Sequence, residues 1–448
     1  MKDKAAGGKK PSSEKTVASG FVKKRPASAG PTAGAGEAIA KVTPARWAAF
    51  EILKLVGEGK GHSDELLHSS RLEGLSPEDR NLTTALVLGV LRWQIALDAR
   101  IRPLLQRPEQ SLAEPVAIAL RLGAFQLLHM DRIPAHAALS ESVELCRAAG
   151  EPHAAGMVNA ILRKVAGSPK AGVKLHESTA AFAERLGHPL WMVERWVKEY
   201  GRAAALKICE ADQREPAEGG MFAESGGDWP QMDDGSRLVA EIAAASMPGA
   251  GRVWDCCAAP GGKTLVLARR LGVAEILASD VSAKRLAQMQ ARLRRYSYAE
   301  RVRLEVADAV DARGVEGSFD LILCDAPCSG TGTMAGNPEI RHRLNVEEFA
   351  RQAVRQKAIL EGALKRLAPN GRLVYSTCSL EPEECERVVE SLRGVRRVSV
   401  EDLIAELGEQ GIFLSGVDLG SAIKDGALRT LPGVQDGDGF YAVVLEWE

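Results

Sequence analysis

The chain has 448 residues, 45% of them hydrophobic and 26% charged, which is enough for two or three packed domains. With a net charge of −1, the chain has no overall positive electrostatic field that would attract nucleic acid, so any basic surface must be local. Eight cysteines without regular spacing, and no signal peptide or long apolar run, indicate a reducing cytoplasm and no membrane partner.

Residues 1–40 are rich in Lys, Gly, Ala, Ser and Pro, and they carry eight basic residues against three acidic ones. Such a composition cannot bury enough apolar surface to fold. We therefore expect a disordered basic tail, which either solubilises the chain or binds RNA without specificity.

Residues 41–168 predict a compact all-α domain, because apolar residues recur at helical spacing, as at Leu82, Leu86, Val90 and Leu97. Residues 169–235 are less regular and predict a small connecting subdomain. Within it, the spacing of Leu190, Val193 and Val197 predicts a short helix before Tyr200-Gly201. Glycine pairs and Pro230 then interrupt the pattern.

Residues 236–448 alternate short apolar strands with helical stretches. The strands are expected at Val253–Cys256, Glu275–Ala278, Arg303–Val306, Leu321–Cys324, Leu373–Ser376 and Tyr441–Leu445. This alternation predicts an α/β domain of the Rossmann-like kind, with a mainly parallel sheet covered on both faces. Ligands of such sheets bind beyond the carboxyl ends of the strands.

A glycine loop follows the first strand, in the segment Cys257-Ala258-Ala259-Pro260-Gly261-Gly262-Lys263. Glycines let a backbone approach a ligand closely, and the start of the next helix attracts negative groups. A phosphate loop would require glycine at position 257, and a GxGxxG dinucleotide fingerprint is absent. The loop therefore predicts a nucleotide-like cofactor without a phosphate signature.

Asp280 and Asp308 follow the second and third strands, and Asp325 follows the fourth. A carboxylate at the second strand end suits the hydroxyls of a ribose, and one at the third can accept from an exocyclic amine. Each aspartate alone is better explained as an ordinary helix N-cap. As an ordered set behind the glycine loop, they favour ribose and adenine, and hence S-adenosylmethionine as the cofactor.

Two cysteines follow strand ends, Cys328 three residues after Asp325 and Cys378 between Thr377 and Ser379. A thiolate that adds to C6 of cytosine makes C5 nucleophilic, and Asp325 can hydrogen-bond the base as N3 gains proton density. No C-x-x-C pair is present, so no metal site is expected. The segment 381–384 is expected to open a helix that runs through Val388-Val389, and the N-terminus of such a helix stabilises a nearby thiolate, although the neighbouring glutamates oppose this effect.

These motifs, with Asp438-Gly439-Phe440-Tyr441-Ala442, resemble the Nol/Nop/Sun family of RNA 5-methylcytosine methyltransferases. The resemblance implies that Cys378 is the nucleophile and that Cys328 assists release. It also implies S-adenosylmethionine contacts from Cys257, Ala258, Ala259, Pro260, Gly261, Gly262, Lys263, Asp280, Asp308 and Asp325.

The segments 121–128, 133–138 and 158–163 resemble the NusB-like helical domain of family members that methylate 16S ribosomal RNA. The resemblance implies 16S rRNA as the partner, and we expect a monomer. The segment after Pro216 is shorter than is usual in the family. Two alternatives stay open: a transfer-RNA methyltransferase of the same chemistry, and a noncatalytic RNA-binding assembly factor, which would need neither thiol.

Local basic patches are the expected RNA contacts. The candidates are Lys284, Arg285, Arg292, Arg294 and Arg295 on one helix, and Arg341, His342 and Arg343 after the Asp325 motif. A solvated helix face is the other explanation for the first group.

Overall fold

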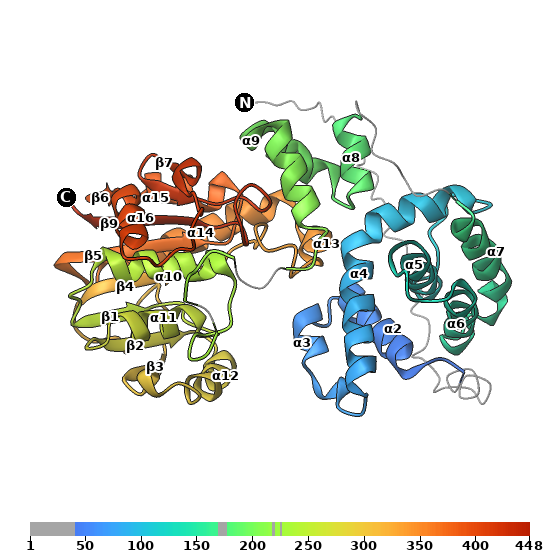
Figure 1. Cartoon of the computed structure of the whole chain (residues 1–448), viewed down its shortest axis with the longest axis horizontal. Helices are drawn as coiled ribbons and strands as arrows, with labels where there is room; N and C mark the ends of the chain where they lie inside the picture. The colour runs from blue at the N-terminus through green and yellow to red at the C-terminus, as the bar shows by residue number, and fades with distance from the viewer. Residues whose placement is uncertain (1–40, 169–176, 217–219, 225) are drawn as a thin grey trace, which may run out of the picture.

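The computed structural model describes residues 41–168, 177–216, 220–224 and 226–448. A helical half and an α/β half lie side by side, with a pair of helices between them at one edge (Figure 1). The tail expected at residues 1–40 lies outside the described residues.

The helical half is a bundle around one apolar core. Its helices are α2 (Pro44–Gly57), α3 (Ser63–Leu67), α4 (Pro77–Ile101), α5 (Glu114–His129), α6 (Ala135–Ala148) and α7 (Ala155–Ala166). Helix α4 is long and apolar enough to cross a membrane by length and composition. Leu86, Val90 and Leu97 of this helix are nevertheless buried in the bundle, so α4 is a core helix.

The connecting helices are α8 (Thr179–Arg185) and α9 (Leu190–Ala211), which pack together. Gly201 interrupts α9 with φ of +80°, a conformation that glycine adopts without strain. The short helix predicted before Gly201 is therefore present, but the chain resumes a second helical stretch after it. The prediction missed that second stretch.

The α/β half contains one mixed sheet in the order β3-β2-β1-β4-β5-β9-β8-β7, with β6 also paired to β9. Strands β1 to β5 are parallel, and β9 is antiparallel to β5. The bounds are β1 Arg252–Asp255, β2 Glu275–Asp280, β3 Val302–Val306, β4 Phe319–Asp325, β5 Leu367–Thr377, β6 Val395–Val398, β7 Ile423–Lys424, β8 Ala427–Arg429 and β9 Tyr441–Trp447.

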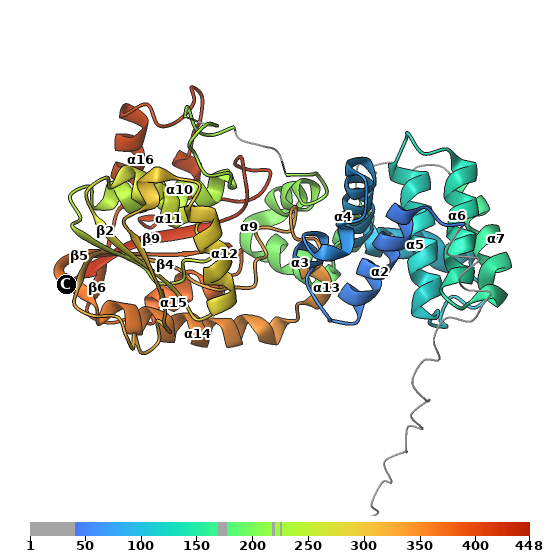
Figure 2. The same ribbon diagram turned by 90° about the horizontal axis from the view of Figure 1, so that it is seen from below.

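Helices cover both faces of this sheet. Figure 2 shows α10 and α16 on one face and α14 on the other. The bounds are α10 Asp234–Ser246, α11 Gly262–Arg270, α12 Ala283–Leu293, α13 Ile340–Arg343, α14 Val346–Leu364, α15 Glu386–Glu390 and α16 Val400–Glu409. The predicted Rossmann-like class and all six predicted strands are confirmed. The prediction missed β6, β7 and β8, which have two to four residues each.

Helix α13 joins the two halves, and it corrects the expectation that Arg341 and His342 face RNA. Arg341 is only 2% exposed, and its guanidinium donates to the carbonyl oxygens of Arg92 at 3.0 Å, Gly187 at 3.2 Å and Asp212 at 3.4 Å. His342 Nε2 lies 2.7 Å from the carbonyl oxygen of Leu91. These basic groups therefore hold the helical half and the connecting helices against the α/β half.

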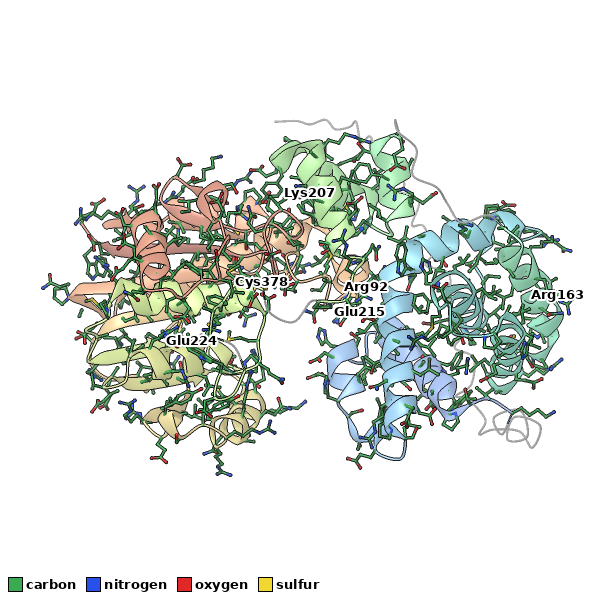
Figure 3. All side chains as sticks on the ribbon, viewed as in Figure 1. Arg92, Arg163, Lys207, Glu215, Glu224 and Cys378 are labelled. Carbon is green, nitrogen blue, oxygen red and sulfur yellow. The ribbon has the colours of Figure 1, made fainter. Side chains whose placement is uncertain are left out.

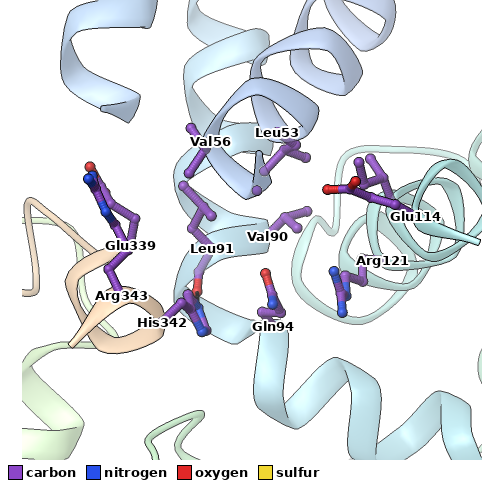
Figure 4. A pocket seen from close by; sticks show the side chains of 12 residues that line it. Leu53, Val56, Val90, Leu91, Gln94, Glu114, Arg121, Glu339, His342 and Arg343 are labelled. Atoms are coloured by element: carbon purple, nitrogen blue, oxygen red, sulfur yellow. Dashed lines mark hydrogen bonds between the residues drawn. The ribbon is translucent and has the colours of Figure 1, made fainter. Parts of the chain in front are cut away.

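A pocket of about 310 Å³ lies at the same joint. Figure 4 shows Glu339, His342 and Arg343 on one side of it and the α4 residues Val90 and Leu91 on the other. At the joint, the backbone amide and hydroxyl of Ser63 donate to the carboxylate of Glu339 at 3.2 and 2.8 Å. The helical half is thus tied to α13 by several buried polar contacts.

Replacing Arg341→Met should lower the thermal unfolding midpoint by several degrees. Removing a buried hydrogen-bonding group costs about 1–3 kcal/mol for each partner left unsatisfied, and three carbonyl groups lose their donor. Differential scanning calorimetry measures the change. Arg343→Met, at an exposed neighbour on the same helix, is the matched control and should change the midpoint little. An Arg341 variant as stable as its control would contradict a structural role.

Candidate active site

The glycine loop forms one wall of a cavity of about 230 Å³ at the carboxyl end of β1. Gly261 has φ of +96°, and a Cβ there would lie 2.8 Å from Cγ of Met289 on α12. Both the backbone conformation and the packing therefore require glycine. The cavity is lined by Gln231, Met232, Ser236, Asp255, Cys257, Ala258, Ala259, Pro260, Gly262, Lys263, Arg292 and Asp325.

Lys263 points from the start of α11 to the end of β4. Its Nζ lies 2.7 Å from Oδ2 of Asp325 and 2.7 Å from Oγ of Ser236. Oδ1 of Asp325 accepts a hydrogen bond of 2.7 Å from Ser376 on β5. Burial lowers the pKa of Lys263, but the charge and hydrogen bond of Asp325 outweigh it and raise this pKa overall. Lys263 therefore carries a positive charge beside the strand ends that lead to Cys328 and Cys378.

Asp255 is buried beneath the loop at the end of β1. Burial raises the pKa of Asp255 to about 7, although the hydrogen bond of 2.6 Å from Thr264 opposes the rise. The charge of Asp325 contributes to the rise. The floor of the cavity thus holds a carboxyl group whose pKa lies well above its usual value.

Asp280 ends β2 and Asp308 follows β3, but neither lines this cavity. Asp280 is 4% exposed and pairs with Arg285 at 3.1 Å, and Arg285 also donates to the carbonyl oxygen of Ala259. Asp308 is exposed and accepts from the backbone amide of Val310 at 3.0 Å. The structure therefore brings Cys257–Lys263 and Asp325 together, with the two other aspartates farther along the same sheet edge.

Cys328 and Cys378 face each other, with a Sγ–Sγ distance of 3.3 Å. Both are partly exposed, unlike Cys146, Cys209, Cys324 and Cys385, which are buried as expected. The hydrogen bond with Cys378, burial, and the negative charges of Cys378 and Glu384 raise the pKa of the Cys328 thiol well above its usual value. The Cys328 thiol therefore holds its proton more tightly than an ordinary thiol does.

The expected helix after Cys378 is not continuous, so that prediction was wrong. Pro382–Glu384 forms a single 3₁₀ turn, and Cys385 breaks the chain direction before α15 begins at Glu386. Burial and neighbouring negative charge, including that of Glu386, raise the pKa of the Cys385 thiol to about 12. A helix N-terminus therefore does not account for a thiolate at Cys378.

Helix α9 holds the segment that follows Cys378 in place. Arg195 donates to the carboxylate of Glu381 at 2.7 Å, and the indole of Trp196 donates to it at 3.1 Å. The hydroxyl of Tyr200 donates to the carbonyl oxygen of Leu380. Figure 3 places Cys378 on the side of the sheet nearest the helical half. The connecting helices thus shape the loop after Cys378 as well as linking the halves.

Sequence reasoning assigned no cofactor role to five residues that line this cavity: Gln231, Met232, Ser236, Asp255 and Arg292. Gln231, Met232 and Ser236 come from the segment around the start of α10, where no local pattern indicated a role. Arg292, which was expected only in a basic RNA patch, is the next-to-last residue of α12 and donates to the carbonyl oxygen of Gln231. In the same expected patch, Lys284 lies 3.6 Å from Glu65 of the helical half. Arg294 and Arg295 follow α12 rather than lying on it.

Comparisons with known proteins agree with this architecture. Residues 247–446 match the model of the 16S rRNA methyltransferase RsmB/F family, and residues 43–167 match the NusB family. The crystal structure of PH0851 superposes with a TM-score of 0.67 over 90% of this chain and 99% of that chain. At 20% sequence identity, this likeness concerns the fold alone.

Two curated relatives match almost from end to end. Ribosomal RNA small subunit methyltransferase B of Xanthomonas campestris pv. campestris is 31% identical over 92% of this chain and 99% of its own length. The probable ribosomal RNA small subunit methyltransferase B of Bacillus subtilis is 30% identical over 90% of this chain and 98% of its own length. The chain therefore belongs to the RsmB/F family of 16S rRNA methyltransferases, and it is an S-adenosylmethionine-dependent rRNA methyltransferase with a NusB-like N-terminal domain.

Proposed function

We propose that this chain methylates C5 of a cytosine in 16S ribosomal RNA through a covalent bond between Cys378 and C6 of the base. The observation that supports it is the pair of partly exposed thiols 3.3 Å apart, beside the charged pair of Lys263 and Asp325. A protein that only binds RNA would need neither. The names of the curated relatives support the small-subunit rRNA as substrate.

The cofactor site fits S-adenosylmethionine. The loop at residues 257–263 leaves a cavity beside its glycines, and a Cβ at Gly262 would approach Met232 to 3.3 Å. We assign Asp280 to the ribose hydroxyls and Asp308 to the adenine amine, because carboxylates accept hydrogen bonds from both groups. When bound, S-adenosylmethionine supplies the methyl group that C5 receives.

The protein's own residues then act on the cytosine. The Cys378 thiolate forms a bond to C6, which moves electron density to C5 and N3. Asp325 hydrogen-bonds the base while electron density builds at N3, and Lys263 and Ser376 hold this carboxylate in place. After methyl transfer, C5 loses its proton to a base, the C5=C6 double bond re-forms, and the C6–S bond breaks with its electrons on Cys378.

We assign Cys328 to this last step. Its thiol lies next to the departing sulfur, and its raised pKa keeps a proton available there. An S–H donor to the departing sulfur stabilises the negative charge that the bond cleavage leaves on it. The two thiols therefore have different roles although they lie in similar loops.

We also assign residues 41–168 to RNA binding, residues 169–235 to the connection, and residues 236–448 to catalysis, in a monomeric cytoplasmic enzyme. The match of residues 43–167 to the NusB family supports the first assignment. The NusB-like domain also favours ribosomal RNA over the transfer-RNA alternative.

Cys378→Ala should abolish methyl transfer while changing the dissociation constant of S-adenosylmethionine less than about twofold, because the thiol is needed for attack and not for cofactor binding. Cys328→Ala should still allow attack and methyl transfer, but the protein–RNA adduct should accumulate. A tritium-methyl transfer assay, isothermal titration and a denaturing gel measure the three quantities.

Cys146→Ala is the matched control, since this cysteine is buried in the helical half, and it should behave as the unmodified enzyme. An adduct that accumulates with Cys378→Ala instead of Cys328→Ala would show that the roles are reversed. Full turnover in both variants would remove both thiols from the mechanism.

Asp280→Ala should weaken S-adenosylmethionine binding roughly tenfold or more, because a hydrogen bond to a charged group contributes about 1.5–3 kcal/mol. Isothermal titration measures the change, and RNA affinity should stay the same. Asp311→Ala, at an exposed aspartate near Asp308, is the control. A change of less than about twofold, far below that range, would reject the ribose assignment.

A further inference from the structure

Glu384 is a buried carboxylate that touches both cysteine loops. Around the Cys328 loop, its Oε1 accepts from the backbone amide of Ser329 at 2.9 Å, and its Oε2 accepts from the Ser329 hydroxyl. Gln356 of α14 donates to the same carboxylate at 3.2 Å and to the carbonyl oxygen of Pro327 at 3.0 Å. The backbone on both sides of Cys328 is therefore held by one network.

The same carboxylate also holds the Cys378 loop. The Ser379 hydroxyl donates to Oε2 of Glu384 at 2.5 Å, and it also lies 3.1 Å from the Ser329 hydroxyl. The hydroxyl of Tyr375 on β5 donates to the backbone carbonyl oxygen of Glu384 at 2.7 Å, which fixes this residue against the sheet. One side chain thus connects the residue after each thiol, and it sets the separation of the two sulfurs.

The other acidic groups near Glu384 each form an ion pair with a basic side chain. Glu381 pairs with Arg195, and Glu386 pairs with Arg429. Asp325 pairs with Lys263. The described groups that contact Glu384 are neutral hydroxyls, amides and carbonyls. The titratable or charged groups around Glu384 and the two loops are Cys328, Cys378, Tyr375, Cys385, Glu381, Glu386, Arg429 and Lys263.

Among these neighbours, Glu384 is the carboxylate whose charge raises the pKa of Cys328. Burial and adjacent negative groups raise the pKa of Tyr375 well above its usual value, and the pKa of Cys385 is about 12, so both are neutral. Burial raises the pKa of Glu384, and the four donors that point at its carboxylate oppose this rise and favour the ionised form. A negative charge beside Cys328 opposes loss of the Cys328 proton.

We propose that Glu384 is a positioning residue for methyl transfer, which fixes the two thiol loops together and confines the proton to Cys328, so that Cys378 is the sulfur free to attack. This inference rests on the proposed roles of the two cysteines. Glu384 acts through Cys328, Ser329 and Ser379 and makes no contact with the reacting atoms itself. It makes two similar cysteine loops chemically unequal.

The test compares Glu384→Gln, which keeps the shape and removes the charge, with Glu384→Asp, which keeps the charge and shortens the reach. The pH dependence of iodoacetamide alkylation at Cys328 is followed by mass spectrometry of proteolytic fragments. Glu384→Gln should shift the midpoint for Cys328 to lower pH by about one unit or more, the lower end of the effect of one neighbouring charge. Glu384→Asp should leave that midpoint near its original value.

Both variants should lower kcat at least tenfold while cofactor affinity, measured by titration, stays within twofold. Glu390→Gln is the matched control, because Glu390 is an exposed glutamate of the adjoining α15, and neither its alkylation profile nor its kcat should change. An unchanged Cys328 midpoint in Glu384→Gln overturns the charge role, and kcat near the original value in both variants overturns the positioning role.

The same data separate this inference from the proposed function. If Cys378→Ala retains turnover, the proposed cysteine mechanism fails whatever Glu384 does. If Cys378→Ala is inactive and Glu384→Gln behaves as the unmodified enzyme, only the inference about Glu384 fails.

Discussion

The parallel pairing of β4 with β5 is the constraint on which the active site depends. In this register Asp325 lies opposite Ser376, so the loops that leave the two strands start side by side. Cys328 comes three residues after Asp325 and Cys378 two residues after Ser376, which places their sulfurs 3.3 Å apart. A shift of one residue would turn the alternating side chains to the opposite face and separate these groups.

The two loops then fold back on the rest of the α/β half. Gly332 packs so closely that a Cβ there would lie 2.2 Å from the carbonyl oxygen of Gly439, and the amide of Gly439 donates to the carbonyl oxygen of Gly332 at 2.8 Å. Beyond this contact the chain continues into α13, where Arg341 fixes the helical half. The segment that carries Cys328 therefore links the reaction site directly to the NusB-like domain. We expect that a movement of this domain when RNA binds would also displace the Cys328 loop.

The sequence predicted those parts of the molecule that depend on local pattern. The six main strands and the loop from Cys257 to Lys263 follow from apolar runs and glycine positions, which are local properties. The burial of Arg341 depends instead on three carbonyl groups from segments up to 249 residues away, so a basic run was mistaken for an RNA surface. Glu384 was overlooked for the same reason, because its partners lie on two other loops and on α14.

The covalent bond between Cys378 and cytosine is the central claim of this account, and RNA carrying 5-fluorocytidine tests it most directly. Fluorine at C5 cannot leave as a proton does, so an adduct that has received its methyl group cannot resolve. The unmodified enzyme is incubated with S-adenosylmethionine and small-subunit rRNA that contains this base. Nuclease digestion and peptide mass spectrometry then locate the bond. The account predicts a nucleotide bound to Cys378 only when the cofactor is present. A nucleotide on Cys328, or none on either cysteine while ordinary RNA is methylated, would contradict it.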